Sequence, residues 1–507
     1  QMCIRDRLIF LLNIGMAIVF NLGSNVFLGE ISYITQALAA VLQLAVTMDY
    51  SIFLLESYEA NKERYEGDKK RAMAHAISNT FTSITASSIT TVAGFVALCF
   101  MTFKLGTNIG IVMSKGVVIG VLTCVTVLPA MILTCDKAIE KTTHRSLIPS
   151  LDKLSHGIVK GRYVALLLFL IVLVPAIHGN NNYKIYYNID QSLPKNIPSN
   201  EANEKLKKEF NMSNMHMILL KDGLSAKEKS AMSKEIEKVD GVKWVIGLNS
   251  LVGSNVPESM IPNDIKKMLK TDNYELEFVS SDYSSATDEV NSQLAKIDKI
   301  VKKYQNDGMV IGEAPMMKDL QDVTDVDLKT VNNISILAIF VIILITFKSI
   351  SIPVILISVI EFAIACNMAV PFYTNTSLPF VASIVIGTIQ LGATVDYAIL
   401  MTSRYHKERT ERGQSKKDAI RIAHETSIKS ILTSGLCFFA ATFGVSVYSQ
   451  VDMIGSICTL LSRGAIISMI VVICVLPAML WIFDGVIKRT SWNMIKANVA
   501  KRDAEKK

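Results

Sequence analysis

Two Asp-Tyr pairs carry the most distinctive chemistry of this chain, because Asp49-Tyr50 and Asp396-Tyr397 lie 347 positions apart in otherwise apolar stretches. Burying a carboxyl group in hydrocarbon costs roughly 2.5–3.5 kcal/mol on insertion scales, so an acid there is a functional candidate. A poorly solvated carboxyl group can bind and release protons near neutral pH, and a neighbouring Tyr hydroxyl can donate to its charged form. We therefore predict a protonatable site shared by two related halves.

The composition is that of a membrane protein. Half of the 507 residues are hydrophobic, the mean hydropathy is +0.36, and 19% are charged, against about 25% in a soluble domain. Ten segments are long and apolar enough to cross ~30 Å of hydrocarbon. These predicted spans are 8–28, 34–55, 80–101, 107–133, 163–179, 328–347, 351–371, 378–402, 429–448 and 456–484. The sequence therefore predicts a polytopic α-helical membrane protein.

Basic residues gather in four places, namely residues 62–71, 134–162, 404–421 and 488–507. By the positive-inside rule we expect all four to face the cytoplasm, which places residues 180–327 outside. This bias accounts for most of the formal net charge of +7. No nucleic-acid partner is expected.

The repeat extends beyond the acidic pairs at offsets of 346 to 348 residues. The matching segments are Gly15–Asn21 with Glu361–Asn367, Ser114–Gly116 with Ser462–Gly464, and Val127–Met131 with Val475–Met479. Both copies run in the same direction, so we expect parallel repeats with function at the interface between the halves. Residues 163–347 have no counterpart in the first copy, so we expect a fragment of a twelve-span protein.

The predicted organisation has six parts, one of which is soluble in character. They are a first-half bundle (1–134), a cytoplasmic linker (135–162), a span (163–179), an external α/β domain (180–327), a second-half bundle (328–485) and a basic tail (486–507). In the external domain we predict strands at 215–221, 242–246, 274–279 and 309–311 and helices at 226–239 and 285–304. This β-α-β-β-α-β order is a split β-α-β unit, and a generic lid without independent function stays open.

Weaker candidates lie near the Asp-Tyr pairs. The hydroxyls of Thr47, Thr394, Ser87 and Ser434 either extend a proton path or are ordinary helix-packing groups. Glu361 is an additional protonatable group, a residue bonded to a neighbouring helix, or partly exposed. Two repeated basic residues, Lys115 and Arg463, either reach the membrane surface or pair with one of these acids.

Several chemistries have no signature in the sequence. It contains no G-x-x-x-x-G-K-[ST], H-E-x-x-H, G-x-S-x-G or C-x-x-C motif. We therefore expect no catalytic residue, no metal site and no cofactor. The energy is expected to come from a proton gradient, with Na⁺ left open.

The doubled Asp-Tyr pair, the repeated V-L-P-A-M and the stretch Asn188–Pro198 together resemble the resistance-nodulation-division superfamily, and more narrowly its MmpL-type branch, the MMPL family. The resemblance implies a bundle with ten of twelve spans present, a porter-like external domain, and a proton relay formed by Asp49, Tyr50, Asp396 and Tyr397. It also implies export of hydrophobic or amphiphilic molecules, lipids or drugs, from a bacterial cytoplasmic membrane, with membrane lipids and a small-molecule substrate as partners. A homo-oligomer is left open.

Three alternatives to this interpretation stay open. Each Asp can simply bond a neighbouring helix. The chain can also be an accessory of protein translocation, or a sterol-sensing-like lipid receptor. Tripartite drug pumps resemble this chain less, because they carry two adjacent carboxylates on one helix and a Lys on the other. Span 378–402 has no Lys.

Overall fold

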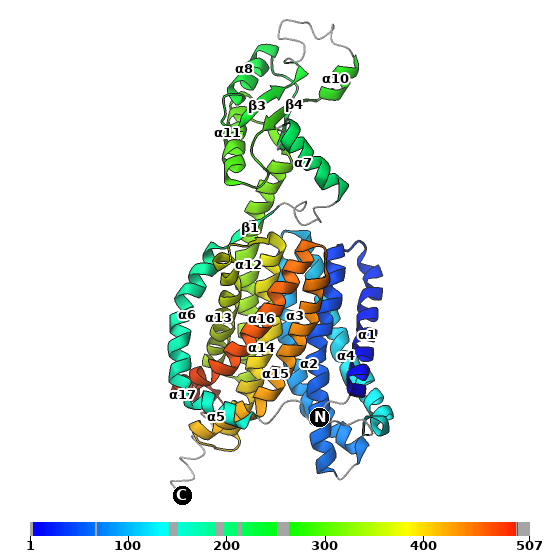
Figure 1. Cartoon of the computed structure of the whole chain (residues 1–507), viewed down its shortest axis with the longest axis vertical. Coiled ribbons are helices and arrows are strands. Elements are labelled where there is room, and N and C mark those ends of the chain that lie inside the picture. The colour runs from blue at the N-terminus through cyan, green and yellow to red at the C-terminus, as the bar shows by residue number, and fades with distance from the viewer. Residues whose placement is uncertain are drawn as a thin grey trace. The chain divides into compact units, whose positions relative to one another are not determined.

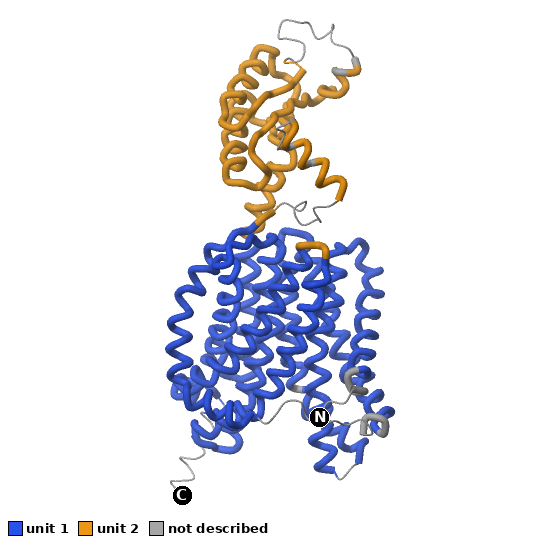
Figure 2. Tube along the Cα trace, in the orientation of Figure 1, with its two compact units in different colours: residues 1–185, 327–449, 453–507 blue, residues 186–326, 450–452 orange. Residues whose placement is uncertain are grey.

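The computed structural model describes residues 4–65, 68–140, 151–187, 197–210, 214–248, 250, 263–492 and 494. The chain divides into two compact units (Figures 1 and 2). The membrane unit comprises residues 1–185, 327–449 and 453–507, and the α/β unit comprises residues 186–326 and 450–452. Most of the Asn188–Pro198 motif and residues 141–150 of the predicted linker lie outside the described residues.

Ten helices among the described residues are long and apolar enough to cross a membrane, which confirms the predicted number of spans. They are α1 (Ile4–Gly23, continued by the 3-10 turn Ser24–Leu28), α2 (Tyr33–Arg64), α3 (Lys69–Ala97, followed by the 3-10 turn Leu98–Phe100), α4 (Lys104–Glu140), α6 (Arg162–Asn182), α12 (Glu313–Phe347), α13 (Ser351–Tyr373), α14 (Phe380–Thr410), α15 (Lys416–Tyr448) and α16 (Asp452–Cys474). Two shorter helices of the same unit are α5 (Asp152–Lys160) and α17 (Leu476–Thr490). In Figure 1 the long helices of this unit run side by side.

The predicted tenth span, 456–484, is wrong as a single helix. The helix α16 ends at Cys474 and α17 begins at Leu476, with Pro477 in its first turn. Proline has no backbone N–H to donate and its ring crowds the preceding turn, so a break just before it is the expected result. The equivalent Pro129 lies inside α4, which continues past it to Glu140.

The two halves of the membrane unit meet through two equivalent helix pairs, each with one helix from either half. The helix α14 packs against α3 of the first half, and α15 packs against α2. At Gly94 a side-chain Cβ would lie 3.3 Å from Gly392 Cα, so the backbones of α3 and α14 approach closely there. Within its apolar window α14 is 89% buried and α6 only 11% buried, as expected for a central and a lipid-facing helix.

The α/β unit contains a four-stranded antiparallel sheet in the order β3-β4-β2-β5. Its elements are α7 (Pro198–Phe210), β2 (Asn214–Lys221), α8 (Ala226–Ile236), β3 (Val242–Ile246), α10 (Asn263–Leu269), β4 (Tyr274–Ser281), α11 (Asp288–Tyr304) and β5 (Met309–Gly312). All six predicted elements are present in the predicted order, while α7 and α10 were not predicted. Two further short strands, β1 (Lys184–Tyr186) and β6 (Ser377–Pro379), pair with each other.

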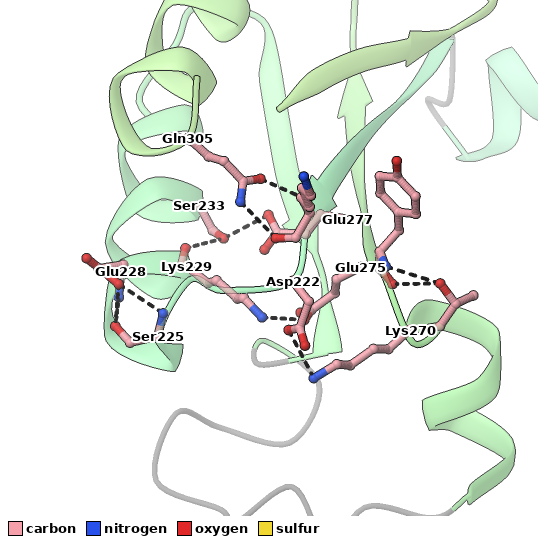
Figure 3. Close-up of polar contacts among 12 residues, drawn as sticks. Asp222, Ser225, Glu228, Lys229, Ser233, Lys270, Glu275, Glu277 and Gln305 are labelled. Carbon is pink, nitrogen blue, oxygen red and sulfur yellow. Dashed lines mark hydrogen bonds and ion pairs between the residues drawn. The ribbon is translucent and has the colours of Figure 1, made fainter. Parts of the chain in front are cut away.

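One face of this sheet packs on its helices. Ile218 of β2 and Val279 of β4 form a core with Ile236 of α8 and Ile297 of α11. Alternate residues of a strand share a face, so Glu275 and Glu277 point to the same side as Val279 and are buried there. Figure 3 shows the polar groups that surround these two acids.

Candidate functional site

The carboxyl group of Asp396 joins the two halves of the membrane unit. Asp396 lies on α14, and its Oδ2 accepts a hydrogen bond from Ser87 Oγ of α3. Thr90 Oγ1 lies 3.3 Å from the other oxygen, Oδ1, but only 2.6 Å from the carbonyl oxygen of Ser87. Ser87 is therefore the principal donor. The predicted relay residue Asp396 and the predicted neighbour Ser87 are brought together across the interface.

Asp49 occupies the matching position on α2 but is bonded differently. It is 4% exposed, and its Oδ1 is buried and accepts no hydrogen bond from any described residue. Ser434 of α15, the repeat equivalent of Ser87, lies beside it, but no hydrogen bond forms with its hydroxyl. The two halves therefore place the same residue types at the seam with different bonding.

The two tyrosines cross between the halves. Tyr50 and Tyr397 are 0% and 1% exposed, and their hydroxyls make no hydrogen bond in the described part of the chain. Tyr50 lies within electrostatic range of Asp396, and Tyr397 within range of Asp49. The carboxyl groups of Asp49 and Asp396 are also within range of each other. We call these four side chains, together with Ser87, Thr90 and Ser434, the seam.

Three weaker candidates lie apart from the acids. Thr47 faces Gly120 of α4 in its own half, where a Cβ on that glycine would lie 2.6 Å from the Thr47 hydroxyl. Thr394 donates to the carbonyl oxygen of Gln390 on its own helix, at 2.7 Å. Glu361 of α13 is partly buried, and its Oε1 has no hydrogen-bond partner among the described residues. None of the three is bonded to an Asp-Tyr pair.

A duplicated Asn-Gln-base cluster lies less than two helical turns before each Asp. In the first half, Asn21 donates to Gln43 at 2.9 Å, Gln43 donates to the Gly116 carbonyl oxygen at 3.1 Å, and Lys115 donates to Asn25 Oδ1 at 2.6 Å. Lys115 is therefore engaged with the helix α1 and the turn that follows it. The ion pair considered for Lys115 is not among the described contacts.

The second half repeats this cluster with an arginine. Asn367 donates to Gln390 at 2.8 Å, and Arg463 donates to the side chain and the backbone oxygen of Asn367 at 2.7 and 2.9 Å. Arg463 thus binds α13, the repeat equivalent of the α1 that Lys115 binds, and no ion pair to a carboxylate is among its described contacts. The partners of Lys115 and Arg463 were not predicted, although Asn21 with Asn367 and Gln43 with Gln390 recur at offsets of 346 and 347 residues.

A second duplicated cluster, also unassigned from the sequence, ties each Asp-Tyr helix to the last helix of its half. In both copies a Tyr hydroxyl and a basic side chain share one buried Asp. The members are Tyr58, Lys62 and Asp136, with distances of 3.2 and 3.1 Å to the acid, and Tyr405, Arg409 and Asp484, with distances of 2.5 and 3.0 Å. The α2-α4 and α14-α17 pairs are therefore each held by charge-assisted bonds.

Comparison with known proteins decides the family. The chain matches the MMPL family over residues 7–148 and 191–503. It belongs to the MMPL family. The resemblance drawn from the doubled Asp-Tyr pair is thereby confirmed, and an MMPL protein is a polytopic membrane protein.

Two named relatives are considerably longer than this MMPL chain. It is 22% identical over 495 residues to a putative membrane protein, ActII-3, of Streptomyces coelicolor, an alignment that covers 93% of this chain and 65% of that one. It is 24% identical over 267 residues to a probable transport protein, MmpL12, of Mycobacterium tuberculosis, covering 50% of this chain and 23% of that one. The chain therefore spans less than two thirds of the length of either relative.

Proposed function

We propose that this protein is a secondary active transporter of a bacterial cytoplasmic membrane that uses the proton gradient to export hydrophobic or amphiphilic compounds, lipids or drugs among them. The observation that carries the proposal is the bond from Ser87 of one half to Asp396 of the other, with Asp49 and both tyrosines buried beside it. Membership of the MMPL family and the description of MmpL12 as a probable transport protein agree with it.

The seam can couple proton binding to movement because its bonds cross between the halves. When Asp396 is ionised, the Ser87 hydroxyl makes a charge-assisted bond, roughly twice as strong as a neutral one. Protonation removes the charge and turns an acceptor into a donor, so the contact between α3 and α14 weakens. Repacking of two parallel repeats is a recognised way to open a path to alternate sides of a membrane.

An apolar cargo fits the partly exposed face of the α/β unit. On the side of the sheet opposite its helices, Met217, Leu219 and Leu276 are only partly buried within the described chain. We propose that this unit is extracytoplasmic and porter-like, and that its sheet contacts the exported molecule through such apolar surface.

The proposal is tested with inverted membrane vesicles from cells that produce the protein. Uptake of rhodamine 6G, an amphiphilic cation, and of a fluorescently labelled phosphatidylethanolamine is followed while a proton gradient is imposed and then collapsed with an uncoupler. We expect uptake of at least one probe that stops with the uncoupler. If neither probe moves in vesicles with the unaltered protein, the transport proposal is overturned, and binding without movement would indicate a lipid receptor.

The coupling residues are tested in the same vesicles. Asp49→Asn keeps the shape of the side chain but cannot release a proton, so we expect it to abolish gradient-driven uptake. Thr394→Val is the matched control, because this hydroxyl bonds only its own helix, and near-normal uptake is expected. A sodium gradient in place of the proton gradient identifies the ion, and drive by sodium alone would contradict proton coupling.

A further inference from the structure

Glu56 is an acid of the membrane unit that the seam does not include. It lies on α2, seven residues after Asp49, and residues at this spacing share one face of a helix two turns apart. Its Oε2 accepts a hydrogen bond of 2.8 Å from Ser430 Oγ of α15. Glu56 is exposed, whereas Asp49 is buried. A carboxyl group at the surface of the membrane unit therefore lies on the same face as the enclosed one.

The facing helix carries hydroxyls at the same two levels. Ser430 and Ser434 of α15 are one turn apart, on one face, and are 3% and 1% exposed. Ser434 lies beside Asp49, while Ser430 bonds Glu56. The gap between side chains one turn apart is about 5–6 Å, which a single bridging water can span. Acid, hydroxyl, hydroxyl and acid thus follow one another from the seam to solvent.

The second half has no counterpart of this arrangement. The repeat equivalents of Glu56 and Ser430 are Ser403 and Ser83, so the acid at this level is present once. The asymmetry matches that of the seam, where Asp396 is bonded by Ser87 but Asp49 Oδ1 has no donor among the described residues. The less strongly held carboxyl group is the one that faces the hydroxyl path.

We propose that Glu56 is the residue through which protons pass between Asp49 and the solvent at the basic end of α2, by way of Ser434 and Ser430. A proton that leaves the Asp49 carboxyl group joins the Ser434 hydroxyl as that group gives up its own proton towards Ser430. Ser430 in turn protonates the Glu56 carboxylate, which releases the proton to water, and rotation of both hydroxyls restores the path. No other reactant is needed. Arg404 of α14 is the charged group that acts on Glu56 from across the interface.

This inference rests on the proposed proton-driven transport, and its test separates the two. In inverted vesicles the cytoplasmic face is outside, so small weak acids added to the buffer reach the predicted position of Glu56. We expect Glu56→Gln to slow gradient-driven rhodamine 6G uptake by about tenfold, and azide or formate to restore much of it, because a mobile weak acid can replace the missing carboxyl group. Ser430→Ala should slow uptake less than Glu56→Gln does. Ser403→Ala, at the repeat equivalent of Glu56, should leave uptake unchanged.

Each outcome decides between the two claims. If the unaltered protein shows no gradient-driven uptake, the transport proposal itself fails. If it does, and Glu56→Gln is as fast, the proton path through Glu56 is overturned while the transport proposal stands. A loss that azide and formate do not restore, in protein produced at normal levels, assigns Glu56 to structure and also overturns the path.

Discussion

The two units each bury acidic side chains, but they surround them with different groups. In the α/β unit Lys229 of α8 forms an ion pair with Glu275, and both side chains are buried (Figure 3). In the membrane unit Asp396 receives hydroxyl donors, and no ion pair to Asp49 or Asp396 is among the described contacts. A hydroxyl stabilises a carboxylate far less than an ammonium does. The difference separates an acid that is held in a salt bridge from one to which the proposed function assigns proton exchange.

Glu277 of the α/β unit shows how burial beside a hydroxyl donor affects a carboxyl group. Its carboxyl group accepts a hydrogen bond of 3.1 Å from Ser233, and no ion pair to it is among the described contacts. Its pKa is raised to about 7, chiefly by burial and also by the charge of Glu275, while the Ser233 hydroxyl and Lys229 oppose the shift. The bonding of Asp396 by Ser87 has the same form, a carboxyl group beside a serine hydroxyl.

The largest expected effect contrasts these two serine-bonded acids. Asp396→Asn should reduce gradient-driven export by 100-fold or more, because an amide can neither bind nor release the proton on which coupling depends. Glu277→Gln makes the same chemical change outside the seam and should leave the export rate within twofold. The rates are compared in energised vesicles at equal amounts of protein. Equal losses in both variants would remove the distinction between a coupling acid and a structural one.

Breaking the ion pair of the α/β unit should have the next largest effect. Lys229→Met leaves Glu275 buried without its cation, and removing one partner of a buried pair typically costs 3–5 kcal/mol. Amide hydrogen exchange of β2 and β4 in the detergent-solubilised protein measures this as a loss of protection. The double change Lys229→Met with Glu275→Leu removes both charges and should recover most of it. A single variant as protected as the unaltered protein would show that the pair contributes little.

The stability of the α/β unit should also depend on pH through Glu277. Its pKa is raised from 4.5 to about 7 in the folded unit, so between these values the folded unit binds more protons than the unfolded chain. The contribution of Glu277 to the free energy of unfolding is therefore highest below pH 4.5 and falls as the pH rises to about 7. The shift corresponds to a loss on the order of 3 kcal/mol.

Hydrogen exchange of β4, corrected for the intrinsic effect of pH on the exchange chemistry, measures this dependence. Glu277→Gln should flatten the profile, because a glutamine has no proton to lose in this range. The Glu228→Gln control changes an acid at the start of α8 that is exposed and lies in the same unit. A slope that survives Glu277→Gln would assign the dependence to another group.

Much of the fold was predictable because its signals are local. The apolar runs that predicted ten spans and the alternation that predicted β2 and β4 depend on neighbouring residues alone. The break before Pro477 was missed because the same five residues, Val-Leu-Pro-Ala-Met, occur in both halves with different results. They interrupt the helix in the second half, whereas in the first half Pro129 lies inside the continuous helix α4. The helix α10 has only 7 residues, too short a pattern to be predicted from periodicity.

The site was predictable only as far as the repeat extends. Equal offsets paired Asp49 with Asp396 and Ser87 with Ser434 as candidates, and the structure bonds Asp396 to Ser87. Equal offsets could not indicate that Asp49 Oδ1 would lack a donor, or that Thr47 would face Gly120 within its own half. Such differences depend on the rotation of each helix and the direction of each side chain, which spacing does not determine.

The smallest expected effect measures the asymmetry of the seam itself. Ser87→Ala removes a hydrogen bond to a carboxyl group, worth about 1.5–3 kcal/mol when that group is charged, and should slow export by roughly tenfold or more. Ser434 makes no hydrogen bond with Asp49 in this conformation, so Ser434→Ala should slow export only by as much as Ser430→Ala, the other hydroxyl of the proposed proton path. Initial rates of the two variants in the same vesicle preparation give the ratio directly. Equal effects would mean that the two halves exchange bonding patterns during the cycle, so that Asp49 acquires the serine bond that Asp396 holds here.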